Sequence, residues 1–179
     1  MPTLSRHLIV DAPADAVWEV VGRQFDRVGA WATAIPRSAP ILAPTTSAAP
    51  RQAAQSATSD APVAGRVCHT GVRLVPLVTE RLVAYDDANR TFTYQAEQHP
   101  RFLKTARNHW RVEAIDQRRT RISLHATVQP RGVLGWAAFL LLRVQLARVA
   151  AGFLQDLRYY VEHGRPSPRK QRQLDTSKR

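Results

Sequence analysis

The most constraining feature of this sequence is a long stretch of alternating polar and apolar residues that leads directly into a long helical pattern. Alternation begins at Gly65 and persists to Pro130, and an apolar helical pattern then covers residues 133–163. A period of two predicts strands with one wet face and one covered face. The short gaps between the strands predict an antiparallel meander, because a parallel crossover needs a dozen or more residues.

The alternating stretch divides into five predicted strands. They cover residues 66–74, 78–85, 91–98, 106–115 and 120–129, with turn-forming residues at 86–89 and 116–119. One face of the later strands is apolar, as Phe92, Trp110 and Leu124 illustrate, whereas the intervening residues, such as Arg111 and His125, are polar. A long helix on the apolar face would complete the fold.

The N-terminal part of the chain predicts one further strand and one helix. Residues 4–10 form an apolar-rich segment, and Pro13 follows where a first helical turn tolerates proline. Apolar residues then recur at helical spacing, which predicts an amphipathic helix over residues 14–28. These residues are Val17, Val21, Phe25 and Val28. A short helical piece is expected over residues 31–35.

Residues 40–62 interrupt this pattern with an Ala-, Pro- and Ser-rich insert that lacks periodicity. Such a composition buries little apolar surface, so we expect disorder, with a lid over a binding site as the alternative. The chain is therefore interpreted as a single domain of residues 1–164 that contains this insert, with a basic, disordered tail over residues 165–179.

The helix over residues 133–163 has an expected inner stripe and a defined end. The stripe consists of Leu140, Val144, Ala147, Ala151, Leu154 and Val161. Gly164 is expected to end the helix, and Pro166 blocks its continuation.

The formal net charge of the chain is +12, almost wholly from arginine, because Lys104, Lys170 and Lys178 are the only lysines. Arg-, Ala- and Pro-rich chains are typical of GC-rich bacterial genomes. A positive charge suits nucleic acid or an anionic membrane, but the basic residues are scattered over the predicted elements apart from the tail. We therefore disfavour nucleic acid as a partner and keep a weak contact of the tail with an anionic membrane as an alternative.

Metal and redox chemistry have little support in the sequence. Cys68 is the only cysteine and is expected to be a buried, inert thiol. The six histidines show no ligand spacing within one element, so we expect no metal and no cofactor. The N-terminus lacks the order of a signal peptide, and the apolar run over residues 133–142 is too short to span a bilayer. The expected location is the cytoplasm.

Four segments carry a resemblance to a known family. They are IVDAPADAVW at residues 9–18, TERLVAYD at 79–86, FTY at 92–94 and YVEHG at 160–164. In this succession the chain resembles the polyketide cyclase/dehydrase family of the START-like (SRPBCC) superfamily over residues 4–164, apart from the insert. The resemblance implies an α+β helix-grip fold, in which an antiparallel sheet of six or seven strands grips the C-terminal helix around a ligand cavity.

The residues expected to face this cavity are mostly aromatic and aliphatic, as in many small-molecule pockets. They are Trp31, Phe92, Tyr94, Trp110, Leu124, Trp136, Leu140 and Val144, with Glu80 and Asn108 as polar members. The alternative is that these side chains only fill the core, and it is the family resemblance that favours a cavity. Glu80 and Tyr94 are the candidate acid/base residues, although Glu80 could instead pair with an arginine on a neighbouring strand.

Three functions remain open from the sequence. We favour binding or transport of a small hydrophobic or amphipathic molecule, such as a lipid or a polyketide-like compound. A cyclase or dehydratase that uses Glu80 and Tyr94 is the first alternative. An interaction module that docks through its basic tail on an anionic membrane or nucleic acid is the second.

Overall fold

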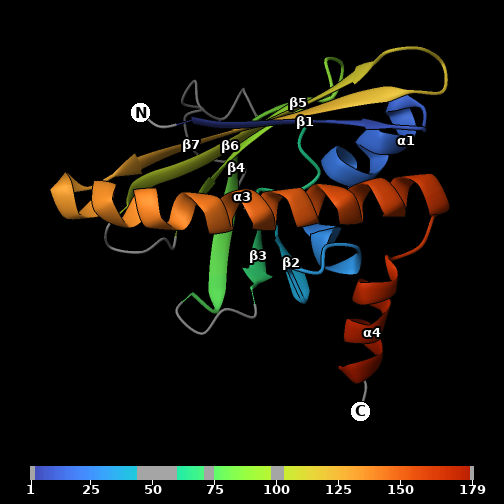
Figure 1. Ribbon diagram of the computed structural model, residues 1–179. Helices are drawn as coiled ribbons and strands as arrows, with labels where there is room; N and C mark the ends of the chain where they lie inside the picture. The colour runs from blue at the N-terminus through green and yellow to red at the C-terminus, as the bar shows by residue number, and fades with distance from the viewer. Residues whose placement is uncertain (1–2, 44–59, 71–74, 98–102, 178–179) are drawn as a thin grey trace.

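The chain folds into one antiparallel sheet with a long helix across one of its faces, as a computed structural model describes for residues 3–43, 60–70, 75–97 and 103–177 (Figure 1). The strands are β1 (Thr3–Val10), β2 (Arg37–Ile41), β3 (Gly65–His69), β4 (Leu77–Asp86), β5 (Thr91–Ala96), β6 (Leu103–Ala114) and β7 (Thr120–Pro130). The helical elements are α1 (Ala14–Trp18), the π-helical η1 (Glu19–Arg23), the 3-10 helix η2 (Phe25–Ala30), α3 (Gly132–His163) and α4 (Pro168–Thr176).

The sheet has seven strands in the order β1-β7-β6-β5-β4-β3-β2, and its neighbouring strands pair antiparallel. This confirms the predicted α+β architecture and the antiparallel meander. The sequence does not predict β2, which begins within the stretch before the insert. As an edge strand that pairs with β3 alone, β2 tolerates Pro40 and needs no strict alternation. Most of the expected insert, residues 44–59, lies outside the described residues.

The predicted helix over residues 14–28 is instead three short helical pieces, α1, η1 and η2. Its predicted apolar face is nevertheless correct, since Val17, Val21, Phe25 and Val28 are all buried. The expected helical piece over residues 31–35 is not formed. Close contacts explain the irregular path: a Cβ atom on Gly29 would lie 2.7 Å from the backbone nitrogen of Ser38.

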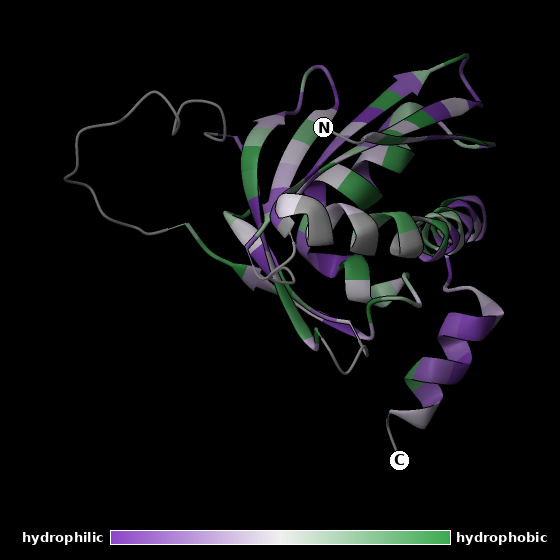
Figure 2. Cartoon of the chain, turned by 60° about the vertical axis from the view of Figure 1, so that its left-hand side comes forward, coloured by the Kyte–Doolittle hydropathy of each residue, from purple (hydrophilic) through white to green (hydrophobic). Residues whose placement is uncertain are grey.

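The core lies between the sheet and the helical segments, and it is rich in aromatic rings. The ring of Phe92 on β5 packs against Trp18, Phe25 and Trp110, with centroid distances of 5.9, 5.4 and 5.8 Å. Hydrophobic and hydrophilic bands alternate along the strands in Figure 2, whereas α4 is mostly hydrophilic. The alternation predicted from the sequence thus separates a core face from a solvent face.

The helix α3 packs on β1 and β7. Its packed stripe passes through Leu154 and Leu157, which are buried, and Val161, which is half-buried. The predicted stripe is wrong at Leu140, Val144 and Ala151, which are exposed. Residues 133–142 are so uniformly apolar that spacing could not select one face. Gly164 ends the helix in the left-handed conformation, with φ of 64°, as expected.

None of the described helices has the length and apolar content that a membrane crossing requires.

The expectation of a disordered tail is wrong for residues 168–176, which form α4 and turn back from the end of α3 (Figure 1). Ser167 caps α4 by accepting a hydrogen bond from the backbone N–H of Lys170, and Pro168 occupies the first helical turn. The Lys170 side chain is fully buried, and its Nζ donates to the carbonyl oxygens of Ile35 and Pro36 at 3.0 and 3.3 Å. The polar, basic composition of this segment predicted a solvated tail, because composition does not show that the carbonyl groups of Ile35 and Pro36 are available to bind Lys170.

A buried carboxylate completes the docking of α4. Asp156 on α3 accepts hydrogen bonds from the Thr33 backbone N–H at 2.8 Å and from the Ser167 hydroxyl at 2.7 Å. It also pairs with Arg169 Nε at 2.8 Å. Asp156 therefore joins α3, the segment after η2 and α4 at one point.

Replacing Asp156 with alanine should release α4, because three donors around a buried site lose their acceptor. We expect a loss of roughly 2–4 kcal/mol. Hydrogen exchange should accelerate in residues 168–176 and 33–36 while the central strands stay protected. Asp175→Ala, on the exposed side of α4, is the control; equal acceleration in both variants would contradict this role of Asp156.

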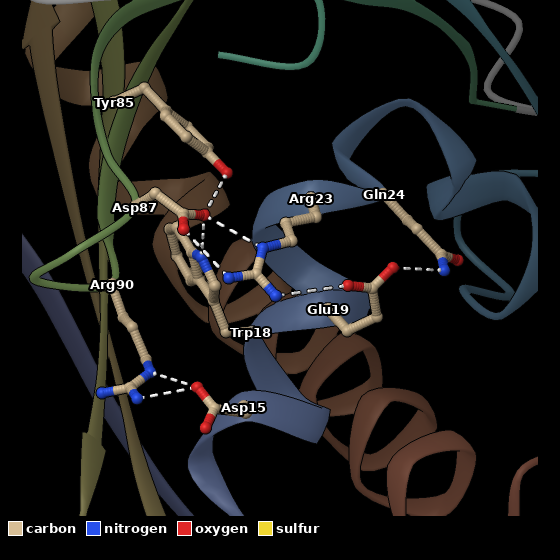
Figure 3. Close-up of polar contacts among 8 residues, drawn as sticks. All are labelled: Asp15, Trp18, Glu19, Arg23, Gln24, Tyr85, Asp87 and Arg90. Carbon is tan, nitrogen blue, oxygen red and sulfur yellow. Dashed lines mark hydrogen bonds and ion pairs between the residues drawn. The ribbon is translucent and has the colours of Figure 1, made fainter. Parts of the chain in front are cut away.

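A second polar cluster holds the α1–η1 segment against the turn between β4 and β5 (Figure 3). Asp87 accepts hydrogen bonds from the Trp18 indole at 2.7 Å, from Arg23 at 2.9 and 3.1 Å, and from the Tyr85 hydroxyl at 3.1 Å. The bonds from Arg23 and Trp18 hold the pKa of Asp87 well below its usual range. All donors of Asp87 come from neighbouring elements, so this cluster fixes the position of the helical segment.

Asp87→Ala should lower the free energy of unfolding by about 1–3 kcal/mol at neutral pH, because the buried Trp18 N–H loses its acceptor. The depressed pKa means that the contribution of Asp87 is present above the unfolded pKa of about 3.9 and is lost as the pH falls further. The difference between variant and wild type in urea unfolding should therefore shrink in acid. Asp15→Ala, which removes an exposed ion pair with Arg90, should change stability little; a pH-independent difference for Asp87→Ala would contradict the linkage.

Candidate functional site

The strand register brings most of the predicted cavity residues together on the face of the sheet that α3 covers. Phe92 lies opposite Trp110, and Trp110 lies opposite Leu124. Tyr94 lies opposite Asn108 in the neighbouring row. These five residues therefore form two adjoining rows across β5, β6 and β7. All are buried except Asn108, which is half-buried.

Trp31 reaches the same region from the segment after η2. Its ring lies 4.6 Å from the ring of Phe153 on α3, measured between centroids, and Phe153 lies 6.0 Å from Trp110. The sheet, the helix and the N-terminal segment thus meet in one aromatic cluster. Much of the space that the sequence assigned to a ligand is occupied by these rings.

Three predicted lining residues are outside this cluster. Trp136, Leu140 and Val144 on α3 are 47%, 52% and 52% exposed. The Trp136 ring packs against Phe139 within the same helix, at a centroid distance of 6.4 Å. These three side chains therefore lie at the surface and not in the buried cluster, and their contact with a ligand stays a prediction.

Glu80 is held in a buried ion pair with Arg66, directly opposite on β3. Glu80 Oε2 lies 2.6 Å from Arg66 Nε, and the two side chains are 14% and 7% exposed. This is the pairing with a neighbouring arginine that the sequence left open. Burial is the largest single effect on Arg66 and opposes its charge, but the attraction of Glu80, together with smaller effects of Cys68 and Tyr94 and the hydrogen bond to Glu80, raises the pKa of Arg66.

Arg66 is positioned by more than Glu80. Its NH1 group donates to the carbonyl oxygen of Phe25 at 2.6 Å, and its guanidinium lies 4.0 Å from the centre of the Phe25 ring. The same guanidinium lies 5.3 Å from the ring centre of Tyr94. Sequence reasoning missed Arg66, although its place two residues before Cys68 in an alternating strand puts both on one face. The buried cation is the polar centre of the site.

The two groups next to this ion pair are kept neutral. Burial raises the pKa of the Tyr94 hydroxyl, so Tyr94 remains a hydrogen-bond donor at physiological pH. Burial likewise raises the pKa of the Cys68 thiol to about 12. The structure therefore supports the expected inert cysteine, since its thiolate is not formed near pH 7.

Two indole N–H groups in the aromatic cluster have no hydrogen-bond acceptor among the described residues. They belong to Trp31 and Trp110, whose side chains are 4% and 3% exposed. The Trp110 N–H has a small lowering effect on the pKa of the Tyr94 hydroxyl. It nevertheless makes no hydrogen bond to that hydroxyl. Buried donors are almost always paired with protein, water or ligand. No pattern in the sequence could reveal these unpaired groups, because they depend on ring orientation.

This arrangement can bind better than it can react. The carboxylate is engaged by Arg66, the thiol is neutral, and the free groups are donors in apolar surroundings. Over the residues that the structure describes, no three His, Cys, Asp or Glu side chains gather in a way that could hold a metal ion.

The contribution of the ion pair to stability can be tested by removing one of its two charges and, separately, by removing both. Glu80→Gln should cost about 3–5 kcal/mol in urea unfolding, because Arg66 then becomes an uncompensated buried charge. The double variant Arg66→Met, Glu80→Leu should be more stable than Glu80→Gln alone, since neither charge remains. A double variant that is less stable than the single one would show that Arg66 acts mainly through Phe25.

Comparison with known proteins places this geometry in context. Residues 1–162 match the family described as polyketide cyclase/dehydrase and lipid transport. No curated protein matches the chain. Among solved structures, it is similar to the ZhuI aromatase/cyclase from Streptomyces sp. R1128, with 17% identity, a TM-score of 0.67 and coverage of 90% of this chain and 93% of that one.

Two further structures share the fold. A START superfamily protein from Mycobacterium smegmatis is 14% identical, with a TM-score of 0.64 over 89% of this chain and 97% of the other. A protein from Thermobifida fusca is 23% identical, with a TM-score of 0.64 over 90% and 93% of the two chains. At these identities the likeness concerns the fold alone.

Proposed function

Because the chain belongs to the polyketide cyclase/dehydrase and lipid transport family, we propose that it binds a small hydrophobic or amphipathic molecule between the inner face of its sheet and α3. The observation that carries this proposal is the pair of buried indole N–H groups on Trp31 and Trp110, which have no acceptor among the residues that the structure describes. A ligand oxygen would supply the missing acceptor. Leaving such a donor unpaired costs about 1–3 kcal/mol.

The surroundings of these donors define the ligand. Phe92, Trp110 and Phe153 pack against one another beside these donors, so the apolar body of a ligand would contact aromatic rings. The Tyr94 hydroxyl and the half-buried Asn108 side chain, from adjacent strands, add polar groups close by. The expected ligand is therefore a lipid or polyketide-like molecule with at least one carbonyl, ether or hydroxyl oxygen.

A cyclase or dehydratase activity is the second candidate. It is favoured by Tyr94, whose hydroxyl keeps its proton and whose ring lies beside the Arg66 cation, an arrangement suited to donating a hydrogen bond to a substrate oxygen. Glu80 is less suited to acid/base work, because its ion pair with Arg66 holds its charge in place. The likeness in fold to an aromatase/cyclase agrees with this candidate without identifying a substrate.

Docking of a free basic tail on an anionic surface has less support. Of the tail's basic residues, Lys170 is buried and Arg169 is paired with Asp156. These two charges are therefore not available to a membrane or a nucleic acid while α4 is docked.

The binding proposal is tested by native mass spectrometry of protein purified from its own host, followed by denaturing extraction of the bound compound. Trp110→Phe and Tyr94→Phe should each weaken binding of that compound about fivefold to tenfold, the loss expected for one hydrogen bond. Trp136→Phe, at an exposed position on α3, is the matched control. Folded variants with unchanged affinity, or a protein that never carries an adduct, would overturn the proposal.

A further inference from the structure

A separate cavity lies on the side of α3 that faces α4. It has a volume of about 450 Å³ and is formed by α3, residues 33–34 and Arg169 of α4, and its size falls in the range of roughly 300–1,000 Å³ that is usual for small-molecule sites. Because the family match ends at residue 162 and α4 begins at Pro168, one wall of this cavity comes from a segment that the family does not define.

The rim of the cavity carries polar groups that the protein does not use. Arg148 and Gln145 are exposed and lie three residues apart on α3, so they are neighbours on its surface. Within the described ranges neither side chain forms a hydrogen bond, and Arg148 has no ion-pair partner. Arg169, by contrast, is bound to Asp156 and to the carbonyl oxygen of Gly152. The charges of Arg169 and Asp156 offset each other, which leaves the positive charge of Arg148.

The wall beside these groups is apolar. Val149 is 50% exposed, and Phe153 rests with its ring against Trp31. Gly152 lets Arg169 approach the helix closely, since a Cβ atom there would lie 3.3 Å from a guanidinium nitrogen of Arg169. Ala34 adds a small side chain from the opposite wall. An exposed valine and a partly exposed phenylalanine next to an unpaired cation are an arrangement that a single amphipathic molecule would cover.

We propose that this cavity binds a small amphipathic carboxylic acid, with its carboxylate on Arg148 and Gln145 and its apolar body against Val149 and Phe153. A guanidinium recognises a carboxylate through two parallel hydrogen bonds, and the glutamine amide supplies a further donor. This site shares Phe153 with the interior proposed above but differs from it in two ways: its polar group is a cation at the surface, and Arg169 of α4 forms part of its wall.

The test compares decanoate with decan-1-ol, which have the same chain length but differ in charge, by isothermal titration calorimetry. Wild type should bind decanoate at least tenfold more tightly than decan-1-ol. Arg148→Gln should remove this preference and leave decan-1-ol binding unchanged. Arg172→Gln is the matched control, because it removes the same charge from an exposed position on α4 outside the cavity. An equal loss in both variants would overturn the proposal as a non-specific charge effect.

Two further variants separate this site from the interior. Val149→Trp, at a half-exposed position, should fill the cavity and abolish decanoate binding without lowering the melting temperature. Tyr94→Phe should leave decanoate binding unchanged. If decanoate binding instead depends on Tyr94 and survives Val149→Trp, the acid occupies the interior; the surface site is then refuted while the interior proposal stands.

Discussion

The packing of rings around Phe92 joins the two halves of the molecule. Phe92 lies on a central strand and contacts Trp18 from α1, Phe25 from the start of η2 and Trp110 from β6. Offset and edge-on aromatic contacts of this kind add to the free energy of burying the rings. The helical segment is therefore oriented by its contacts with the sheet rather than by its own regularity. The backbone carbonyl that Arg66 binds belongs to Phe25, so the same packing also positions the polar centre of the site.

Arg66 and Glu80 show why a buried charge can stay in such a core. Each ion is removed from water, and the cost is offset only because the pair lies directly across two strands and Arg66 also reaches a carbonyl and an aromatic face. The result is a fixed ion pair that lies next to the aromatic rings of Phe25 and Tyr94. Among the described residues, the Trp31 and Trp110 groups left without partners are neutral donors, which is why the arrangement suits recognition of an oxygen-bearing molecule.

The sequence was sufficient to predict every described strand except β2 and the face that most of their residues occupy, because alternation records burial directly. It placed Phe92, Tyr94, Trp110 and Leu124 on one face, and the register confirms that they adjoin. The prediction failed where the residue pattern does not distinguish a buried face from an exposed one. Residues 133–142 of α3 are apolar on all sides, and β2 is an edge strand. Its description of the N-terminal helix was right about the buried positions and wrong about the helix type, since close packing at Gly29 is a tertiary effect.

The candidate site was only partly predictable for a related reason. The alternation of residues along the strand could place the Glu80 side chain on the inner face, where a buried carboxylate needs a partner. That this partner is Arg66 depends on how β3 and β4 pair. The unpaired indole groups depend on ring orientation, and the docking of α4 depends on carbonyl groups far away in the sequence. Composition alone makes α4 look like a solvated tail, because burial of Lys170 is favourable only where those acceptors exist.

That docking also has a consequence for the order in which the molecule forms. The contact between Lys170 and Ile35 spans 135 residues of sequence. Contacts this distant along the chain form late, since the entropy of closing the loop has to be overcome before the contact contributes. During synthesis, residues 33–36 therefore emerge long before their partner Lys170 is added. The corner between α3 and α4 is thus completed only after α4 has been made, so a chain that stops before α4 has the sheet but not this corner.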